Sequence, residues 1–342
     1  MIRKTAAFLL ALVLAACSGS HKGPDVSGVE VKLTPVRFER ELFAIDTNKI
    51  DEGIRALQAK YPVFTRDYFV NILGIPQEAA ETDRHDAITR FLRDYRPVKA
   101  EADKAMPDFS TTEKAVKEGL QHVKYYFPDY KLPSQLITFI GPMDAYAEGA
   151  TGGGGDIISS EALGVGMQLH LGRNADLYTS DMGQQLYPSY VSRRFEPNTI
   201  PVNTMKNIVD DIVPPSKDQS LLGIMVDKGK RMYLLDLFLP ATPDSLKFGY
   251  TAAQTKGVQE NEGLVWNFFV ENNLLYETDV LKLKSFVGDG PKTTELGDGS
   301  PGYIALFTGR QIVKAYMDKF PDTKLQELLS LDAKKILTGS AY

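Results

Sequence analysis

The chain has 342 residues, 43% of them hydrophobic and 10% aromatic, so it can bury a substantial core in one large domain or two modest ones, and we favour one. A net charge of −5 argues against nucleic acid as a partner, because phosphate-backbone binding depends on an excess of lysine and arginine. The single cysteine, Cys17, excludes disulfides and thiolate metal sites from the rest of the chain.

Residues 1–16 are predicted to be a lipoprotein signal peptide. Arg3 and Lys4 give a positive start, and the apolar run that follows is too short for a transmembrane helix, which needs about 20 apolar residues. The run ends in Leu14-Ala15-Ala16-Cys17, which resembles the lipobox of bacterial lipoproteins, whose cysteine sulfur accepts a diacylglyceryl group. We expect cleavage before Cys17 and lipid on its sulfur. The alternative is that Cys17 is an incidental apolar residue of an ordinary signal peptide.

The region after Cys17 is expected to be a flexible tether, because residues 17–28 are rich in glycine, serine and charge and have little to bury. Residues 29–342 then form a single domain. A triacylated N-terminus gains roughly 0.8 kcal/mol per buried methylene and binds a bilayer effectively permanently. The domain therefore needs no membrane-binding surface of its own.

The first third of the domain is predicted to be mainly helical. Val29, Val31 and Leu33 alternate with polar residues before Pro35, which favours an extended segment over residues 29–43, on a sheet edge. Apolar residues at helical spacing then predict helices over residues 47–60, 62–73, 79–95 and 112–126.

The middle of the chain is predicted to hold a small mixed β-sheet. Short apolar runs favour strands over residues 135–140, 156–159 and 163–171. Gly152 to Gly155 favours a hairpin or loop over a phosphate-binding loop, because no glycine pattern here leads from a strand into a helix with a downstream acidic residue. With the flanking helices, these strands predict an α+β fold that is mainly helical.

The last part of the chain returns to helical patterns. A helix over residues 200–212 is followed by a largely apolar helix that Asp218 caps and that runs to Phe238. Another core helix carries the only tryptophan, Trp266, and an apolar set at helical spacing: Leu264, Val265, Phe268 and Phe269. Residues 277–301 are expected to be a long surface loop, followed by a helix over 309–320 and a final turn and helix over 325–337.

The familiar motifs of catalysis are missing from the sequence. None of the four histidines begins a His-Glu-x-x-His zinc motif, and no Gly-x-Ser-x-Gly nucleophile turn occurs. Carboxylates remain candidates, because a fold can bring any two together. Glu260 and Glu262 are expected at a helix start, where acids stabilise the helix dipole. Asp210 and Asp211 stand at the disfavoured end of a helix, which is a weak hint of a partner or a site.

Several short phrases along the chain are informative through their order and spacing. They are Arg37-Phe38, Tyr61-Pro62-Val63-Phe64, Gly164-Val165-Gly166-Met167, Tyr187-Pro188-Ser189-Tyr190, Arg193-Arg194-Phe195, Asp227-Lys228-Gly229-Lys230 and Gly309-Arg310-Gln311-Ile312-Val313. Together with the lipobox they resemble the gliding-motility lipoprotein GldB family of Bacteroidetes, over nearly the whole chain after Cys17.

That family is similar to predicted zinc peptidases with a zincin-like fold, whose metal helix carries His-Glu-x-x-His. The resemblance places the corresponding helix of this chain at Met205 to Val213, which contains no histidine, and places Glu262 near a third ligand position. It implies a zincin-like, peptidase-derived scaffold that has lost its metal site. Asp210, Asp211 and Glu262 would be remnants of that site, and no metal or other cofactor is expected.

The expected function is that of a non-catalytic, periplasm-facing envelope lipoprotein that contacts other proteins of the gliding and associated secretion machinery. Two alternatives stay open. One is a zinc-dependent or carboxylate-based envelope hydrolase or peptidase, and the other is a lipoprotein that binds a small ligand.

Overall fold

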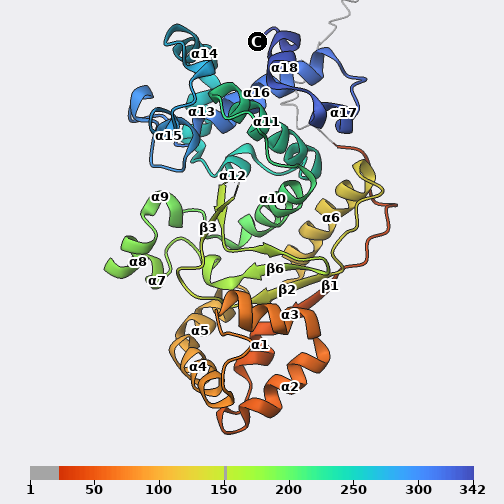
Figure 1. The fold of residues 1–342 in the computed structure, drawn as a ribbon, viewed down its shortest axis with the longest axis vertical. Coiled ribbons are helices and arrows are strands. Elements are labelled where there is room, and N and C mark those ends of the chain that lie inside the picture. The colour runs from red at the N-terminus through yellow and green to blue at the C-terminus, as the bar shows by residue number, and fades with distance from the viewer. Residues whose placement is uncertain (1–22, 150–151) are drawn as a thin grey trace, which may run out of the picture.

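A small mixed β-sheet lies at the centre of the computed structural model, which describes residues 23–149 and 152–342 (Figure 1). Its strands, β1 (Thr34–Arg37), β2 (Gln135–Phe139), β6 (Ala162–Gly166) and β5 (Ile157–Ile158), lie in that order. The first three are parallel and β5 is antiparallel to β6. Leu136, Ile137 and Leu163 are fully buried, as expected for strands covered on both faces. The predicted mixed sheet is therefore confirmed.

Helices make up most of the remaining chain. In the first part they are α1 (Phe38–Phe43), α2 (Ile50–Lys60), α3 (Pro62–Asp67), α4 (Glu81–Asp94), α5 (Arg96–Ala105) and α6 (Ser110–Tyr126). After the sheet come α7 (Asp176–Thr179), α8 (Asp181–Leu186), α9 (Ser189–Ser192), α10 (Ile200–Ile212), α11 (Leu221–Phe238), α12 (Asp244–Phe248), α13 (Ala252–Glu260), α14 (Glu262–Glu271), α15 (Val280–Val287), α16 (Ile304–Lys319), α17 (Leu325–Ser330) and α18 (Ala333–Ser340).

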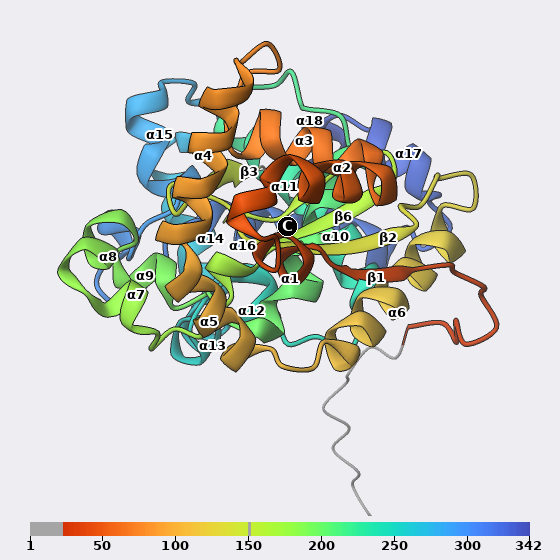
Figure 2. The same ribbon diagram turned by 90° about the horizontal axis from the view of Figure 1, so that it is seen from below.

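The helices form layers around the sheet. Helices α1 to α5 cover one face, and α6, α10 and α11 lie on the other (Figures 1 and 2). The C-terminal helices α13 to α18 lie farther from the sheet, next to and beyond α11, whereas α12 lies nearer to the sheet (Figure 1). The mainly helical α+β prediction is confirmed. The zincin-like fold stays a prediction from the family resemblance.

Helix α11 is buried almost all round, as its apolar sequence predicts. It crosses α16 at two glycines whose backbones touch. A Cβ atom on Gly309 would lie 1.7 Å from the carbonyl oxygen of Met225, and one on Gly229 would lie 2.1 Å from the carbonyl oxygen of Gly309. Only glycine allows the two helices to approach so closely. The N-cap of α11 is Ser220, whose hydroxyl accepts from Gly223 N–H; the prediction that Asp218 caps this helix was wrong.

Several element boundaries differ from the prediction. The extended segment over 29–43 is a strand only at 34–37, and α1 follows at once because Phe38 and Leu42, one helical turn apart, both reach the core. The strand predicted over 163–171 ends at Gly166 and continues as a 3-10 turn. Helices α5 and α13 were not predicted.

The loop predicted over residues 277–301 contains helix α15. Asp279 accepts from Leu281 N–H and caps its start, and Leu283 and Phe286 are buried against the core. In the preceding α14, Leu264 was assigned to the core but is 68% exposed, while Val265 and Phe269 of the same helix are buried.

The glycine run forms a hairpin, as expected. Strand β3 (Ala147–Gly149) pairs antiparallel with β4 (Gly152–Gly154), and the tip, residues 150–151, lies outside the described residues. The predicted signal peptide and Cys17 also lie outside them. Gly23 packs on His122 and Pro240, and Val26 is buried, so the described chain contacts the domain from its first residues. Within the described ranges, no helix combines the length and apolarity that crossing a bilayer requires.

Candidate functional site

A cavity of about 250 Å³ lies where four segments far apart in the sequence meet. The segments are the two ends of the β3–β4 hairpin, the chain that follows β6, the stretch from the α9–α10 turn into the first half of α10, and the chain from α12 into α13. Its walls carry four cations, Arg173, Arg193, Arg194 and Lys206, together with Asn203 and Tyr250. The site is therefore polar and rich in positive charge.

The two adjacent arginines have different partners. Arg194 forms an ion pair with Asp289 and donates to the hydroxyl of Tyr146 at 3.0 Å. Arg193 donates to the carbonyl of Gly249 at 3.2 Å, and its Nε is buried without a hydrogen-bond partner. Among the described residues, no carboxylate forms an ion pair with Arg193. Burial, together with the neighbouring Arg194, lowers the pKa of Arg193. Its positive charge is thus only partly compensated by the protein.

Lys206 adds a cation from α10. Burial and the nearby positive charge of Arg194 lower its pKa to about 8, against the opposing effects of Asp210 and Asp289. Asn203 stands one turn earlier on the same face of α10 and also lines the cavity. The helix that the family resemblance relates to a metal helix therefore presents an amide and an ammonium to this cavity.

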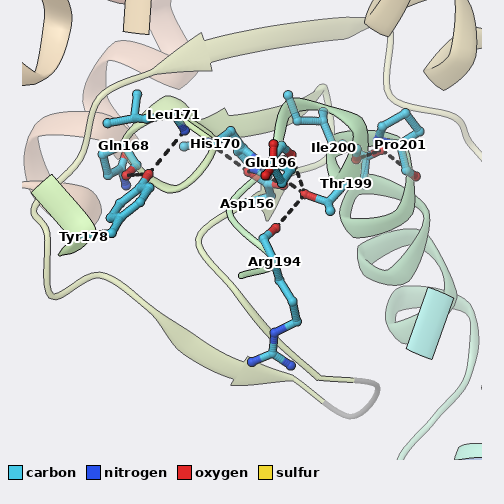
Figure 3. A network of polar contacts seen from close by, with 12 residues as sticks. Asp156, Gln168, His170, Leu171, Tyr178, Arg194, Glu196, Thr199, Ile200 and Pro201 are labelled. Atoms are coloured by element: carbon cyan, nitrogen blue, oxygen red, sulfur yellow. Dashed lines mark hydrogen bonds and ion pairs between the residues drawn. The ribbon is translucent and has the colours of Figure 1, made fainter. Parts of the chain in front are cut away.

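A buried polar network holds the arginine turn in place (Figure 3). The carboxylate of Asp156 lies 3.0 Å from Nε2 of His170, and both side chains are 1% exposed. His170 Nδ1 lies 3.3 Å from the carbonyl oxygen of Glu196 and 3.3 Å from the hydroxyl of Thr199. Thr199 in turn donates to the carbonyls of Arg194 and Glu196, at 3.0 and 2.7 Å. Figure 3 shows the Arg194 side chain leading away from this network.

An aspartate, an imidazole and a hydroxyl in a row have the composition of a hydrolase relay. The Thr199 hydroxyl is nevertheless directed at two backbone carbonyls and the residue is only 6% exposed, so its oxygen is poorly placed to attack a substrate. We interpret the network as a brace that fixes the backbone of residues 194–199. His170 itself is a buried histidine that follows β6.

The carboxylates singled out from the sequence all have partners inside the protein. Asp210 lies 3.0 Å from Nη1 of Arg231, which compensates its position at the C-terminal end of α10. Asp211 accepts from the hydroxyl of Tyr130 at 2.6 Å. Glu262, at the start of α14, accepts from Gln311 at 2.6 Å and from Tyr342 at 2.8 Å. The described residues contain no group of three or more histidine, cysteine, aspartate or glutamate side chains arranged to hold a metal ion.

Sequence reasoning missed the cavity. In the sequence, Arg193 and Arg194 stand out only in a segment that resembles the family, and Lys206 only as a residue of a predicted helix. None of the three was predicted to line a site. The available signal was the adjacent arginine pair, because two like charges side by side are costly unless something compensates them. Nothing local in the sequence indicated that the glycine hairpin and α13 would close around them.

The layered fold and the polar cavity define a mainly helical α+β protein with a site suited to binding. The chain belongs to the gliding motility protein GldB family, whose family model matches residues 19–342. No curated protein and no solved structure matches it. Membership of this family makes the protein a component of gliding motility.

Proposed function

We propose that this protein is a lipid-anchored, periplasm-facing component of the gliding machinery that acts through protein contacts and not by catalysis. The lipobox at Cys17 and the family membership support the anchor and the setting. The internal partners of Asp210, Asp211 and Glu262 support a binding role, because carboxylates engaged in this way are not free to activate water or to hold a metal. Its scaffold would then be a zincin-like one without a metal site.

One observation carries the proposal of protein contacts. Large apolar side chains are exposed along residues 264–281, over α14, the following 3-10 turn and the start of α15. Leu281 is 84% exposed and Val280 is 76% exposed, and the others are Leu264, Val270 and Tyr276. Single exposed apolar residues are common, whereas contiguous apolar surface is typical of interaction sites, and we propose that these side chains belong to one such surface.

In-cell crosslinking tests this surface. A photo-crosslinking amino acid at position 281 should give adducts with another envelope protein, and the same amino acid at Tyr125 on α6, which is also exposed, serves as the matched control. Leu281→Glu should remove the adducts formed from position 264 without lowering the amount of protein. Equal adduct patterns at positions 281 and 125, or no adducts from any position in 264–281, would contradict the proposal.

The cationic cavity favours a second candidate function, the binding of a small ligand. Charged and polar side chains line this cavity, and the proposed protein contacts do not involve it. The hydrolase alternative predicts a different result. A stoichiometric zinc ion in purified protein, with peptide cleavage that chelators abolish, would favour the hydrolase over both binding proposals.

A further inference from the structure

We infer that the cavity between β4, the Arg193–Glu196 turn, α10 and the start of α13 binds a small molecule through an oxyanion group, a phosphate or a carboxylate. This inference develops the ligand-binding candidate and does not depend on the exposed apolar surface. The crosslinking and the experiment below can therefore fail independently.

The guanidinium of Arg193 is the first reason. Arg193 lines the cavity, and its guanidinium donates one hydrogen bond, to a backbone carbonyl. Its Nε is buried without a partner, and it forms no ion pair among the described residues. Leaving such a donor unsatisfied is unfavourable, and a planar guanidinium matches the two oxygens of a carboxylate or phosphate. An oxyanion in the cavity would bind the guanidinium and compensate its charge.

The start of α13 is the second reason. Thr251 and Ala252 line the cavity, and α13 begins there with a capping box between Thr251 and Gln254. The amide groups of a first helical turn and the positive end of the helix dipole favour a negative charge beside them. The helix start and Arg193 lie on the same cavity, so their effects would add at one anion.

Glycines shape the cavity for Arg194. Gly249 has φ +70°, and a Cβ there would lie 2.7 Å from Cδ of Arg194. A Cβ on Gly155 would lie 2.2 Å from Cδ1 of Leu169. Side chains at these positions would displace the arginine or close the wall, so backbone borders the cavity at both places.

The charges and the volume limit the ligand. Arg173 is engaged by Glu196 at 2.5 Å and Arg194 by Asp289, and Lys206 also interacts within the protein. Arg193 and the start of α13 would therefore make the main contacts with a bound anion. About 250 Å³ falls just below the range of about 300–1,000 Å³ typical of ligand pockets. The cavity therefore suits a small molecule and not a folded segment of a partner.

Titration of the full chain in detergent with inorganic phosphate, and separately with acetate, tests the inference. Isothermal titration calorimetry should detect saturable binding of at least one anion, and the comparison shows which oxyanion the cavity prefers. Arg193→Gln should weaken binding by about tenfold or more, the usual effect of losing a charge-assisted hydrogen bond. Arg93→Gln, which removes an exposed arginine paired with Asp94 on α4, should leave the affinity unchanged.

Lys206→Gln gives a second, independent variant in case Arg193→Gln does not fold, and near-UV circular dichroism checks both. Arg194, Asp210, Asp289 and Lys228 act on Lys206 electrostatically. Since the pKa of Lys206 is about 8, wild-type affinity should fall as the pH rises through that value, and Lys206→Gln should lose this dependence. Absence of binding by both anions, or equal weakening by Arg93→Gln and Arg193→Gln, would overturn the inference.

Discussion

Asp156 and His170 stand on either side of β6 in the sequence and meet where neither touches water. Asp156 also accepts from Gly166 N–H at 2.9 Å, so one carboxylate ties together the end of the strand, the histidine and, through it, the arginine turn. Buried groups of this kind are stabilised only while every partner is present. The pair therefore links the stability of the fold to the shape of the cavity.

Replacing Asp156 by alanine should destabilise the protein by about 3 kcal/mol, because it leaves His170 and Gly166 N–H buried without their partner. Urea unfolding followed by circular dichroism measures this change. Asp211→Ala removes a single hydrogen bond with Tyr130 near the surface and should cost about 1 kcal/mol or less. Equal losses for the two variants would contradict the bracing role.

Lys206 should make stability depend on pH in alkaline solution. Its folded pKa of about 8 lies below its ordinary value of 10.5, so the folded state disfavours the proton. The stability that comes from the neutral amine is complete above about 10.5 and is lost as the pH falls toward about 8. Lys206→Met should remove this part of the pH dependence. Lys256→Met, at an exposed position on α13, should retain it in parallel urea titrations.

At the scale of single elements, the long apolar helices could be predicted from the sequence. Helix α10 begins and ends where its flanking prolines and apolar spacing place it, and α11 is as buried as its composition indicates. Helix α15 could not be predicted, because it has only eight residues and lies in a segment rich in glycine, proline and charge. Leu264 shows the opposite error: helical spacing says which residues share a face, but the surrounding chain decides which face is buried.

The crossing of α11 and α16 should tolerate no side chain at its glycines. Gly309→Ala places a Cβ inside the α11 backbone and should destabilise the protein by about 3 kcal/mol or more, or prevent folding. Gly257→Ala, in open space on α13, should instead stabilise it by about 0.5–1 kcal/mol, because alanine loses less backbone entropy in a helix. Thermal unfolding of the two variants should shift in opposite directions. A stable, well-folded Gly309→Ala protein would contradict the close crossing.

At the scale of the whole molecule, the layering could not be predicted from local patterns. Strand β1 pairs with β2 about a hundred residues later, and the cavity is assembled from four separated segments. Local propensity contains no information on such pairings, which depend on how helices pack across the sheet. The class of fold was accessible from the sequence, but the arrangement that creates the candidate site was not.

Lipid on Cys17 is proposed to hold the whole molecule at the membrane. Cys17→Ser should release the protein from membranes into the soluble fraction after cell lysis and abolish labelling by a radioactive fatty acid, because the lipid attaches to the cysteine sulfur. Ser20→Ala, close by in the sequence, should leave both properties unchanged. Continued membrane association of the Cys17→Ser protein, after its signal peptide has been removed, would rule out lipid on Cys17 as the sole attachment.

The contact of Gly23 with Pro240 and His122 restricts how a lipidated molecule could orient itself. Six peptide steps connect Cys17 to Gly23, and a fully extended chain spans at most about 20 Å over that length. The end of α11 and the C-terminal part of α6 would thus stay close to the bilayer surface. The proposed anchor would then hold the protein against the membrane at one edge and leave a limited set of its faces turned away from the bilayer.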